Sequence, residues 1–175
     1  PNPVIIHPNP VSDAIINPVA GCIPLTTTFT NASTGAASYV WNFGNGDTSV
    51  IADTSYTYTI AGMYYPYLVA TSAFGCSDTF FFFFGVAASG TPVPDFATSQ
   101  DSSCAPVIVS FNDNSSGLLN PAYFWDFGNG QTSTLQNPLV TYAIPGVYLV
   151  SLAVTNAGGC TDTIFRNITI LDTPV

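Results

Sequence analysis

Positive charge is almost absent from this sequence. Its 175 residues include no lysine, one arginine (Arg166) and one histidine (His7), and ten acidic residues bring the formal net charge to −9. Nucleic acids are bound through lysine and arginine contacts to phosphate, and anionic membrane surfaces attract basic segments in the same way. The composition therefore excludes nucleic acid and anionic membrane surfaces as partners.

Glutamate is missing too, because all ten acidic residues are aspartate, and charged residues make up only 6% of the chain. Helix-rich proteins rely on Glu, Lys, Leu and Arg, whereas this chain is rich in Thr, Ser, Val, Tyr, Phe, Gly and Pro. The longest apolar run, FFFFFG at residues 80–85, is far shorter than the roughly 18 residues of a membrane-spanning helix. These absences indicate a β-sheet protein without membrane insertion.

Candidate catalytic residues are scarce. A Ser-His-Asp or Cys-His arrangement needs a histidine held by packed neighbours. The single histidine, His7, lies in residues 1–9, which are interpreted as the end of a preceding unit and a proline-stiffened linker. Zinc is not favoured either, because the sequence has no Cys-x-x-Cys pair and no histidine to partner one. We expect no enzymatic activity and no cofactor.

One segment occurs twice, nearly unchanged. The chain reads WNFGNGDTS at residues 41–49 and WDFGNGQTS at residues 125–133. Extending the match to residues 41–86, at an offset of 84, gives 20 identities in 46 positions. The chain therefore consists of two repeats of about 80 residues, the size of an immunoglobulin-type sandwich.

The repeats can be bounded from the same comparison. Upstream the offset is 82, as for Cys22 and Cys104, and the two-residue difference falls in the loop at 115–122. The final TPV repeats residues 91–93 at the offset of 82, as if a third repeat began there. We predict a preceding unit and linker at 1–9, repeat 1 at 10–91, repeat 2 at 92–173 and the start of a further repeat at 174–175.

Within each repeat, apolar and polar residues alternate with a period of two. Residues 25–29 (LTTTF) and 148–154 (YLVSLAV) show this alternation, and Gly, Pro and Asn clusters separate such runs every 8–12 residues. This pattern is typical of an all-β sandwich. The residues expected in the cores include Trp41, Trp125, Tyr64 and Tyr148.

The repeated Phe-Gly-Asn-Gly segment has two interpretations. A phosphate-binding loop would need a lysine and a following helix, and the sequence offers neither. Asn-Gly is the preferred pair of a type I′ hairpin turn, in which both central residues have positive φ. We therefore predict a turn whose first glycine permits a bulge or a close backbone approach. Its residues are Gly44, Asn45 and Gly46 in repeat 1, and Gly128, Asn129 and Gly130 in repeat 2.

These motifs resemble the PKD (polycystic kidney disease) domain, whose pattern joins Trp-Asp-Phe-Gly-Asp-Gly to a later tyrosine and to Pro-Gly-x-Tyr-x-Val. The chain reads YVWNFGNGDTS and YTIAGMYYPYL in repeat 1, and YFWDFGNGQTS and NPLVTYAIPGVYLVSL in repeat 2. The resemblance covers both repeats nearly end to end. The chain departs from the pattern at Asn42, Asn45, Asn129 and Pro66, where the family usually has Asp at the first three positions and a core Val at the last.

The resemblance implies a seven-stranded immunoglobulin-like sandwich for each repeat, with the two repeats head to tail. It also implies a non-catalytic role outside the cell, as a spacer, adhesive or protein-binding module. Some PKD domains of secreted enzymes bind calcium, so Asp47, Asp53 and Asp101 are candidates for a weak calcium site. The favoured interpretation is that they are solvated turn residues.

The four cysteines occupy two equivalent pairs of positions, which favours disulfides in an oxidising, extracellular setting. Pairing within repeats would join Cys22 to Cys76 and Cys104 to Cys160. In the fold that the resemblance implies, however, each such pair lies at opposite ends of a strand of ~23 Å, whereas disulfide-bonded Cα atoms lie ~4.4–6.8 Å apart. We favour an inter-repeat Cys22–Cys160 bond, with the other two cysteines bonded to neighbouring repeats. Within-repeat pairing remains the alternative.

Repeat 1 has an aromatic surface that repeat 2 lacks. If its last two strands keep the register of repeat 2, Phe82, Phe84 and Val86 face the core. A contiguous apolar patch usually marks an interface, and the scarcity of charge favours burial against another copy or another part of the parent protein. A one-residue register slip would merely expose other rings. The residues expected to face outward are Tyr65, Tyr67, Val69, Phe81 and Phe83.

These inferences lead to one main hypothesis and its rivals. The chain is expected to be a structural or adhesive segment of an extracellular tandem-repeat rod or filament, similar to PKD arrays of large bacterial cell-surface proteins. Its partners would be neighbouring repeats and other copies. The alternative is an accessory substrate- or protein-binding module of a large secreted hydrolase, and a sugar-binding module is a third option. Further repeats beyond residue 175 would favour the rod, and a catalytic domain would favour the hydrolase.

Overall fold

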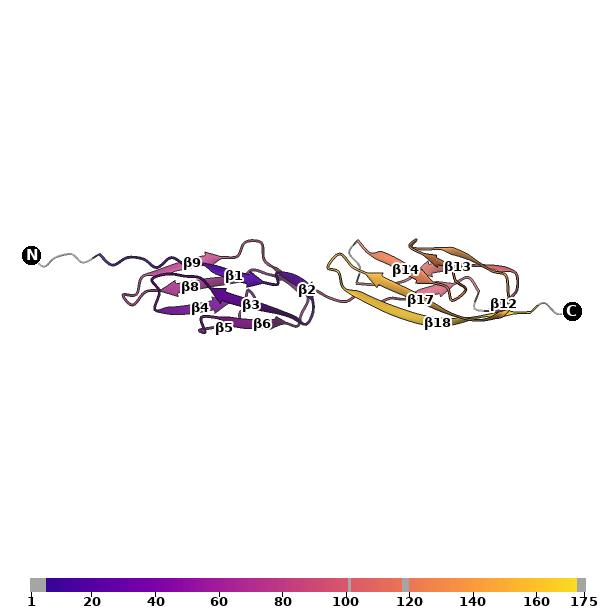
Figure 1. Ribbon diagram of the computed structural model, residues 1–175, viewed down its shortest axis with the longest axis horizontal. Coiled ribbons are helices and arrows are strands. Elements are labelled where there is room, and N and C mark those ends of the chain that lie inside the picture. Colours follow the sequence, from indigo (N-terminus) through magenta and orange to yellow (C-terminus); the bar gives the residue numbers. More distant parts are fainter. Residues whose placement is uncertain (1–5, 101, 118–119, 173–175) are drawn as a thin grey trace, which may run out of the picture. The chain divides into compact units, whose positions relative to one another are not determined.

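The computed structural model describes residues 6–100, 102–117 and 120–172, which divide into two compact units (Figure 1). Unit 1 is Pro1–Ser89 and unit 2 is Gly90–Val175. The division lies two residues before the boundary predicted between residues 91 and 92. The predictions for residues 1–5, Asp101 and residues 173–175 lie outside the described residues.

Unit 2 is a sandwich of two β-sheets. Its strands are β11 (Phe96–Thr98), β12 (Ser102–Cys104), β13 (Val107–Asp113), β14 (Ala122–Asp126), β15 (Thr132–Ser133), β16 (Leu139–Tyr142), β17 (Gly146–Thr155) and β18 (Thr161–Leu171). The smaller sheet has the order β11-β13-β16 and the larger has the order β12-β18-β17-β14-β15. Pairing is antiparallel except between β12 and β18, which are parallel. The long strands β17 and β18 lie side by side (Figure 1).

Unit 1 repeats this plan with its last two long strands each divided into two. Its strands are β1 (Ala14–Asn17), β2 (Ala20–Cys22), β3 (Leu25–Asn31), β4 (Ser38–Asn42), β5 (Thr48–Ser49), β6 (Thr54–Tyr58), β7 (Gly62–Tyr64), β8 (Tyr67–Thr71), β9 (Ser77–Phe81) and β10 (Val86–Ser89). One sheet has the order β1-β3-β6, and two further ladders, β5-β4-β8-β9 and β2-β10-β7, correspond to the larger sheet of unit 2. Among the described strands of unit 1, only β2 and β10 pair in parallel.

Both units reduce to seven strands. In unit 2, β11 and β12 are consecutive parts of one edge segment that pairs first with β13 and then with β18. Unit 1 divides the same edge segment into β1 and β2, and it also divides the last two long strands. The prediction of two all-β, seven-stranded immunoglobulin-like sandwiches is confirmed. The described residues form no helix, and so none of them belongs to a helix that could cross a membrane.

Each core is built around one tryptophan. Trp41 and Trp125 are fully buried, and their indole N–H groups donate to the carbonyls of Ala52 and Leu135 at 3.0 and 2.9 Å. Alternation in β3 buries Leu25, Thr27 and Phe29 and exposes the threonines between them, as the period of two predicts. The buried rings of Phe29 and Phe111 pack on these tryptophans at centroid distances of 5.3 and 5.5 Å.

The last strand of unit 1 contains two extra residues. Tyr67 pairs with Phe81, as Ser151 pairs with Phe165 in unit 2. Three residues earlier on the neighbouring strand, Tyr64 pairs with Val86, whereas Tyr148 pairs with Ile168. The last strand thus advances five residues in unit 1 (81 to 86) and three in unit 2 (165 to 168). The two extra residues form a bulge between β9 and β10, which we call the Phe82–Gly85 bulge.

The bulge corrects one sequence prediction. Phe84 was expected to face the core, but it is 89% exposed. Val86 is fully buried and Phe82 packs partly against the core, as expected. The ungapped comparison failed because the offset returns from 84 to 82 within the bulge, where the backbone turns through Gly85 at a φ of +72°.

The repeated glycine turns are not of type I′. Positive φ occurs at Gly44 and Gly46 and at the equivalent Gly128 and Gly130, but not at the asparagines between them. Each asparagine instead accepts a hydrogen bond through its side-chain oxygen from the backbone N–H two residues later, at 3.2 Å in unit 1 and 3.0 Å in unit 2. This Asx-type turn leaves the left-handed conformations to the flanking glycines. The first glycine in each turn lies against backbone, because a Cβ there would be 2.5 Å from the Tyr65 nitrogen or 2.7 Å from the Leu149 oxygen.

Candidate functional site

Two cysteines occupy equivalent positions at the C-terminal ends of the units. Cys22 ends β2 and pairs in parallel with Ser89, the last residue of β10. Cys104 ends β12 and pairs in parallel with Leu171, the last residue of β18. The next residue donates its N–H to the same last-strand residue at 2.9 Å in both units. Each of these cysteines therefore lies beside the strand by which the chain leaves its unit.

The other two cysteines occupy equivalent hairpins at the N-terminal ends. Cys76 follows the turn between β8 and β9, and Cys160 follows the turn between β17 and β18. In unit 1 the backbone N–H of Ser72 donates to Cys76 at 2.8 Å, and the counterpart bond to Cys160 is 3.0 Å long. The hairpin of unit 2 also holds the incoming chain, because Asn156 donates its side-chain N–H to the carbonyl of Gly90 at 2.7 Å.

The four cysteines are in two different states. Cys22 and Cys160 are disulfide-bonded, whereas Cys76 is a half-buried free thiol and Cys104 an exposed one. Neither within-repeat pair is therefore formed. The geometry of unit 2 gives the reason: Cys160 precedes the eleven residues of β18 and Cys104 pairs with the last of them. Eleven strand residues span about 35 Å, several times the Cα separation that a disulfide allows. The Cys22–Cys160 pairing itself remains a prediction.

An aromatic face covers β8, β9 and the bulge in unit 1. The rings of Tyr67 and Phe81 lie 5.7 Å apart between centroids, and those of Phe81 and Phe83 lie 5.9 Å apart. Phe83 is 80% exposed and Tyr65 is 58% exposed, while Tyr67 and Val69 are half-buried. We call these five residues, Tyr65, Tyr67, Val69, Phe81 and Phe83, the aromatic face. Its members are the residues that the sequence predicted to face outward.

The same face of unit 2 is apolar in part. Leu149 and Phe165 are exposed in positions equivalent to Tyr65 and Phe81. Leu149 pairs with Asn167, and Phe165 pairs with Ser151, so each apolar side chain has a polar neighbour across the ladder. The described residues of unit 2 therefore show no run of adjacent rings on this face like that of unit 1.

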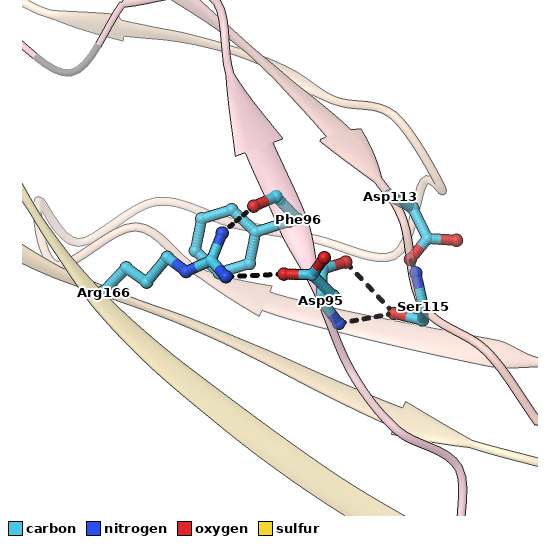
Figure 2. A network of polar contacts seen from close by, with 5 residues as sticks. All are labelled: Asp95, Phe96, Asp113, Ser115 and Arg166. Atoms are coloured by element: carbon cyan, nitrogen blue, oxygen red, sulfur yellow. Dashed lines mark hydrogen bonds and ion pairs between the residues drawn. The ribbon is translucent and has the colours of Figure 1, made fainter.

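The single arginine closes the edge between the two sheets of unit 2 (Figure 2). Arg166 on β18 binds the carboxylate of Asp95 at 2.5 Å, donates to the carbonyl of Phe96 and lies 4.9 Å over the Phe96 ring. The backbone N–H of Asp95 donates in turn to the hydroxyl of Ser115 at 3.1 Å. A cavity of about 310 Å³ opens beside this cluster. Since the guanidinium is engaged with its own unit, the cluster fastens two sheets together rather than offering a site for an anion.

The candidate calcium ligands have structural partners. Asp47 accepts hydrogen bonds from Asn45, at 3.1 Å, and from the hydroxyl of Tyr56. The bond to Asp47, with some burial, raises the pKa of Tyr56. Asp53 accepts a bond from the backbone N–H of Asn31 at 2.9 Å. In the described part of the chain, no three His, Cys, Asp or Glu residues gather as a metal site would require.

Two buried tyrosines form a motif whose role the sequence analysis missed. Tyr58 and Tyr142 are about 1% exposed and donate to the carbonyls of Phe43 and Phe127 at 2.8 and 3.1 Å. Each hydroxyl ties the glycine turn to the opposite sheet, and burial raises the pKa of both phenols. The signal in the sequence was their identity at the offset of 84. The predicted core residues Tyr64 and Tyr148 lie next to them but are only half-buried.

Comparison with known proteins identifies these two sandwiches. The PKD domain profile matches residues 8–82 and 89–170. The chain belongs to the PKD domain family. Each PKD unit carries its own glycine turn, buried tryptophan and buried tyrosine, as the repeat in the sequence indicates.

Proteins of two Vibrio species are similar to part of this chain. Pre-pro-metalloprotease PrtV of Vibrio cholerae serotype O1 is 49% identical over 53 residues, which make up 30% of this chain and 6% of that protein. The solved PKD1 domain of the V. cholerae metalloprotease PrtV is 38% identical and covers 47% of this chain and 99% of its own, with a TM-score of 0.42. The PKD1 domain of Vibrio anguillarum Epp is 33% identical and covers 47% and 96%, with a TM-score of 0.41.

Proposed function

We propose that this chain is a non-catalytic structural segment of an extracellular rod built from tandem PKD units, in which successive units are joined by a disulfide. The observation that carries this proposal is the state of the cysteines. Cys22 and Cys160 are bonded, they belong to different units, and the length of the last strand prevents pairing within a unit. A Cys22–Cys160 bond would fix one unit to the next and stiffen their junction.

The same disulfide supports a location of the chain outside the cytosol. Structural disulfides persist in oxidising compartments outside the cytosol. A net charge of −9 with one internally paired arginine gives no basic surface for nucleic acid. A position outside the cell, as part of a surface protein or secreted protein, agrees with both features.

The test is peptide mapping without reduction. Because the chain has ten aspartates and no glutamate, cleavage before aspartate places the four cysteines in four separate peptides, 13–46, 53–77, 101–112 and 126–161. We expect peptides 13–46 and 126–161 to be joined and to separate on reduction. A link between 13–46 and 53–77 would remove the support for the rod, because the bond would then lie within one unit.

We also propose that the aromatic face is covered by a second copy of this chain. The residues of this face, and those paired with it on β4, include no charged side chain, although the chain carries ten aspartates. Two copies could therefore meet there without burying carboxylates, whose burial would be unfavourable. Adjacent rings on one face also differ from the single, scattered apolar residues of an ordinary surface.

Charge insertion tests this second proposal. Tyr67→Asp with Phe83→Asp should abolish concentration-dependent association in sedimentation or light scattering. Ser151→Asp with Asn167→Asp places the same charges at the equivalent sequence positions of unit 2 and should leave association unchanged. If the unmodified chain stays monomeric at high concentration, the face is not a self-association surface.

One rival function has specific support. The similarity to the PKD1 domain of the PrtV metalloprotease favours an accessory module attached to a hydrolase. Such a module would position its enzyme on a polymer or protein and would not need a disulfide between units. Sequencing the gene on both sides of this segment separates the two functions, because a catalytic domain supports the accessory module and further PKD units support the rod.

A further inference from the structure

We propose that Cys76 and Cys104 are cross-linking sites for the PKD units that precede and follow this pair. Cys104 would bond the hairpin cysteine of a following unit, and Cys76 would bond the C-terminal-end cysteine of a preceding unit. This inference rests on the proposed rod and names the residues through which the rod continues in both directions.

The first support is the equivalence of bonded and free cysteines. Cys104 occupies the same position as the bonded Cys22, at the end of the edge strand that pairs in parallel with the last strand. Both cysteines precede a residue whose backbone N–H donates to a carbonyl of the last strand at 2.9 Å. Two sites built alike, one bonded and one free, indicate that the free site lacks only its partner.

The hairpin sites show the same equivalence. Cys76 and the bonded Cys160 each close a turn through a glycine at positive φ, Gly75 at +83° and Gly159 at +78°. The backbone N–H of each cysteine binds the residue four positions earlier, through the Ser72 hydroxyl at 3.2 Å and the Asn156 side-chain oxygen at 3.1 Å. The backbone therefore presents Cys76 in the same way as a cysteine that does form a disulfide.

The second support is that neither thiol has a partner within its own unit. The last strand keeps the hairpin cysteine and the C-terminal-end cysteine of one unit about 35 Å apart in unit 2, where it is unbroken. A disulfide requires Cα atoms within about 7 Å. A disulfide at Cys104 therefore requires a cysteine from outside unit 2. Because the cysteines occupy equivalent positions in the two units, a disulfide at Cys76 requires a cysteine from outside unit 1.

The third support is access. Cys104 is exposed at the end of β12, so a partner can reach it without rearrangement of unit 2. Cys76 is half-buried in a hairpin turn whose next-but-one neighbour, Phe74, is 62% exposed. The ring of His7 stacks on Phe74 at a centroid distance of 3.6 Å. The segment leading into unit 1 thus already lies against the hairpin that carries Cys76.

The chemistry needs an oxidant, which we take to be a small-molecule disulfide. A Cys104 thiolate attacks one sulfur of that disulfide, and its S–S bond breaks as one thiol leaves. The thiolate of the partner cysteine then attacks the mixed disulfide, so that the second thiol leaves and the protein cross-link forms. Two protein thiols are oxidised and lose two protons, and one small disulfide is reduced to two thiols.

The experiment uses copies of the present chain as stand-ins for neighbouring units. Cys76→Ser and Cys104→Ser variants are incubated with oxidised glutathione at high concentration, separately and mixed, and then run on non-reducing gels. The mixture contains one Cys104 and one Cys76 on different molecules, so we expect a dimer band that neither variant gives alone. Cleavage before aspartate should join peptide 53–77 to peptide 101–112. The unmodified chain should form a ladder through the same link.

Every other outcome overturns the inference. Symmetric Cys104–Cys104 or Cys76–Cys76 dimers, a Cys76–Cys104 bond within one molecule, or thiols that remain free would each show that these are not head-to-tail cross-linking sites. The peptide 13–46 to 126–161 link is read in the same digest. Its presence in a failed experiment leaves the proposed rod standing, whereas its absence removes the rod as well.

Discussion

In unit 2, β17 and β18 pair through ten consecutive residues, whereas in unit 1 the corresponding ladder stops at Tyr67–Phe81 and resumes at Tyr64–Val86. Pro66 lies at the interruption, where unit 2 has Val150 paired with Arg166. Proline has no N–H to donate to a ladder, and only its carbonyl is used, as acceptor for Phe82 at 3.1 Å. The two inserted residues of unit 1 thus lie opposite the position at which the neighbouring strand lacks an N–H donor.

The largest expected effect comes from the feature that both units share. Gly44→Ala or Gly128→Ala should destabilise its own unit by about 3 kcal/mol. The added Cβ would clash with the backbone of the neighbouring strand, and alanine would also be strained at the positive φ of this position. Gly46→Ala and Gly130→Ala are matched controls with positive φ and open space, and should cost about 1 kcal/mol. Urea unfolding followed by tryptophan fluorescence measures both. Equal losses at the two glycines of one turn would show that the close approach is unimportant.

Tyr58→Phe and Tyr142→Phe should each cost about 1–2 kcal/mol, because a buried carbonyl loses its donor. Both pKa values are raised, so the fold favours the neutral phenol. That stabilisation is complete below the ordinary tyrosine pKa of about 10 and is lost as the pH rises above it. The variants should therefore show weaker alkaline destabilisation in pH-dependent unfolding. The exposed Tyr65→Phe is the control and should leave stability unchanged.

Removing the difference between the units should stabilise unit 1. Deletion of Phe83 and Phe84 together with Pro66→Val restores the length and pairing of unit 2, and should add about 1 kcal/mol. Amide hydrogen exchange should slow at the residues that join β9 to β10. Pro66→Val alone serves as the control, since the bulge remains and little should change. If the variant that combines the deletion with Pro66→Val were less stable than the unmodified chain, the Phe82–Gly85 bulge would contribute to the stability of the core.

The smallest effect concerns acid. Asp78 accepts hydrogen bonds from the Ser12 N–H and hydroxyl, both at 2.8 Å, and these bonds lower its pKa. The resulting stabilisation is present above the ordinary aspartate pKa of about 3.9 and is lost as the pH falls below it. Asp78→Asn should therefore reduce the acid sensitivity of unit 1 slightly. Asp162→Asn is the control, because Pro94 replaces Ser12 in unit 2. Acid unfolding of both variants measures the difference.

The fold can be predicted well from the sequence because each strand and turn occurs twice and can be compared between the two repeats. The buried tryptophans and the five residues of the aromatic face could be predicted because side chains alternate between the two faces of a strand with a period of two. Phe84 was predicted wrongly because residues 80–84 are all phenylalanine, so the sequence does not show which of these rings face the core. The insertion is marked only by the offset between the repeats, which has returned to 82 at residues 91–93. The turn type was also wrong, since Asn-Gly is compatible with both an Asx turn and a type I′ turn. The contacts of Arg166 with Asp95 and Phe96 could not be predicted, because these residues lie 70 or more positions away in the sequence.

The parallel pair β12–β18 has a mechanical consequence. Both strands run toward the end at which the chain leaves unit 2, but tension on the chain pulls β12 back toward its start and β18 forward toward its end. The hydrogen bonds between them then carry the load in shear and must break together, whereas those of a hairpin can open one at a time. The edge strand that bears Cys104 is thus also the part of the unit best placed to resist extension.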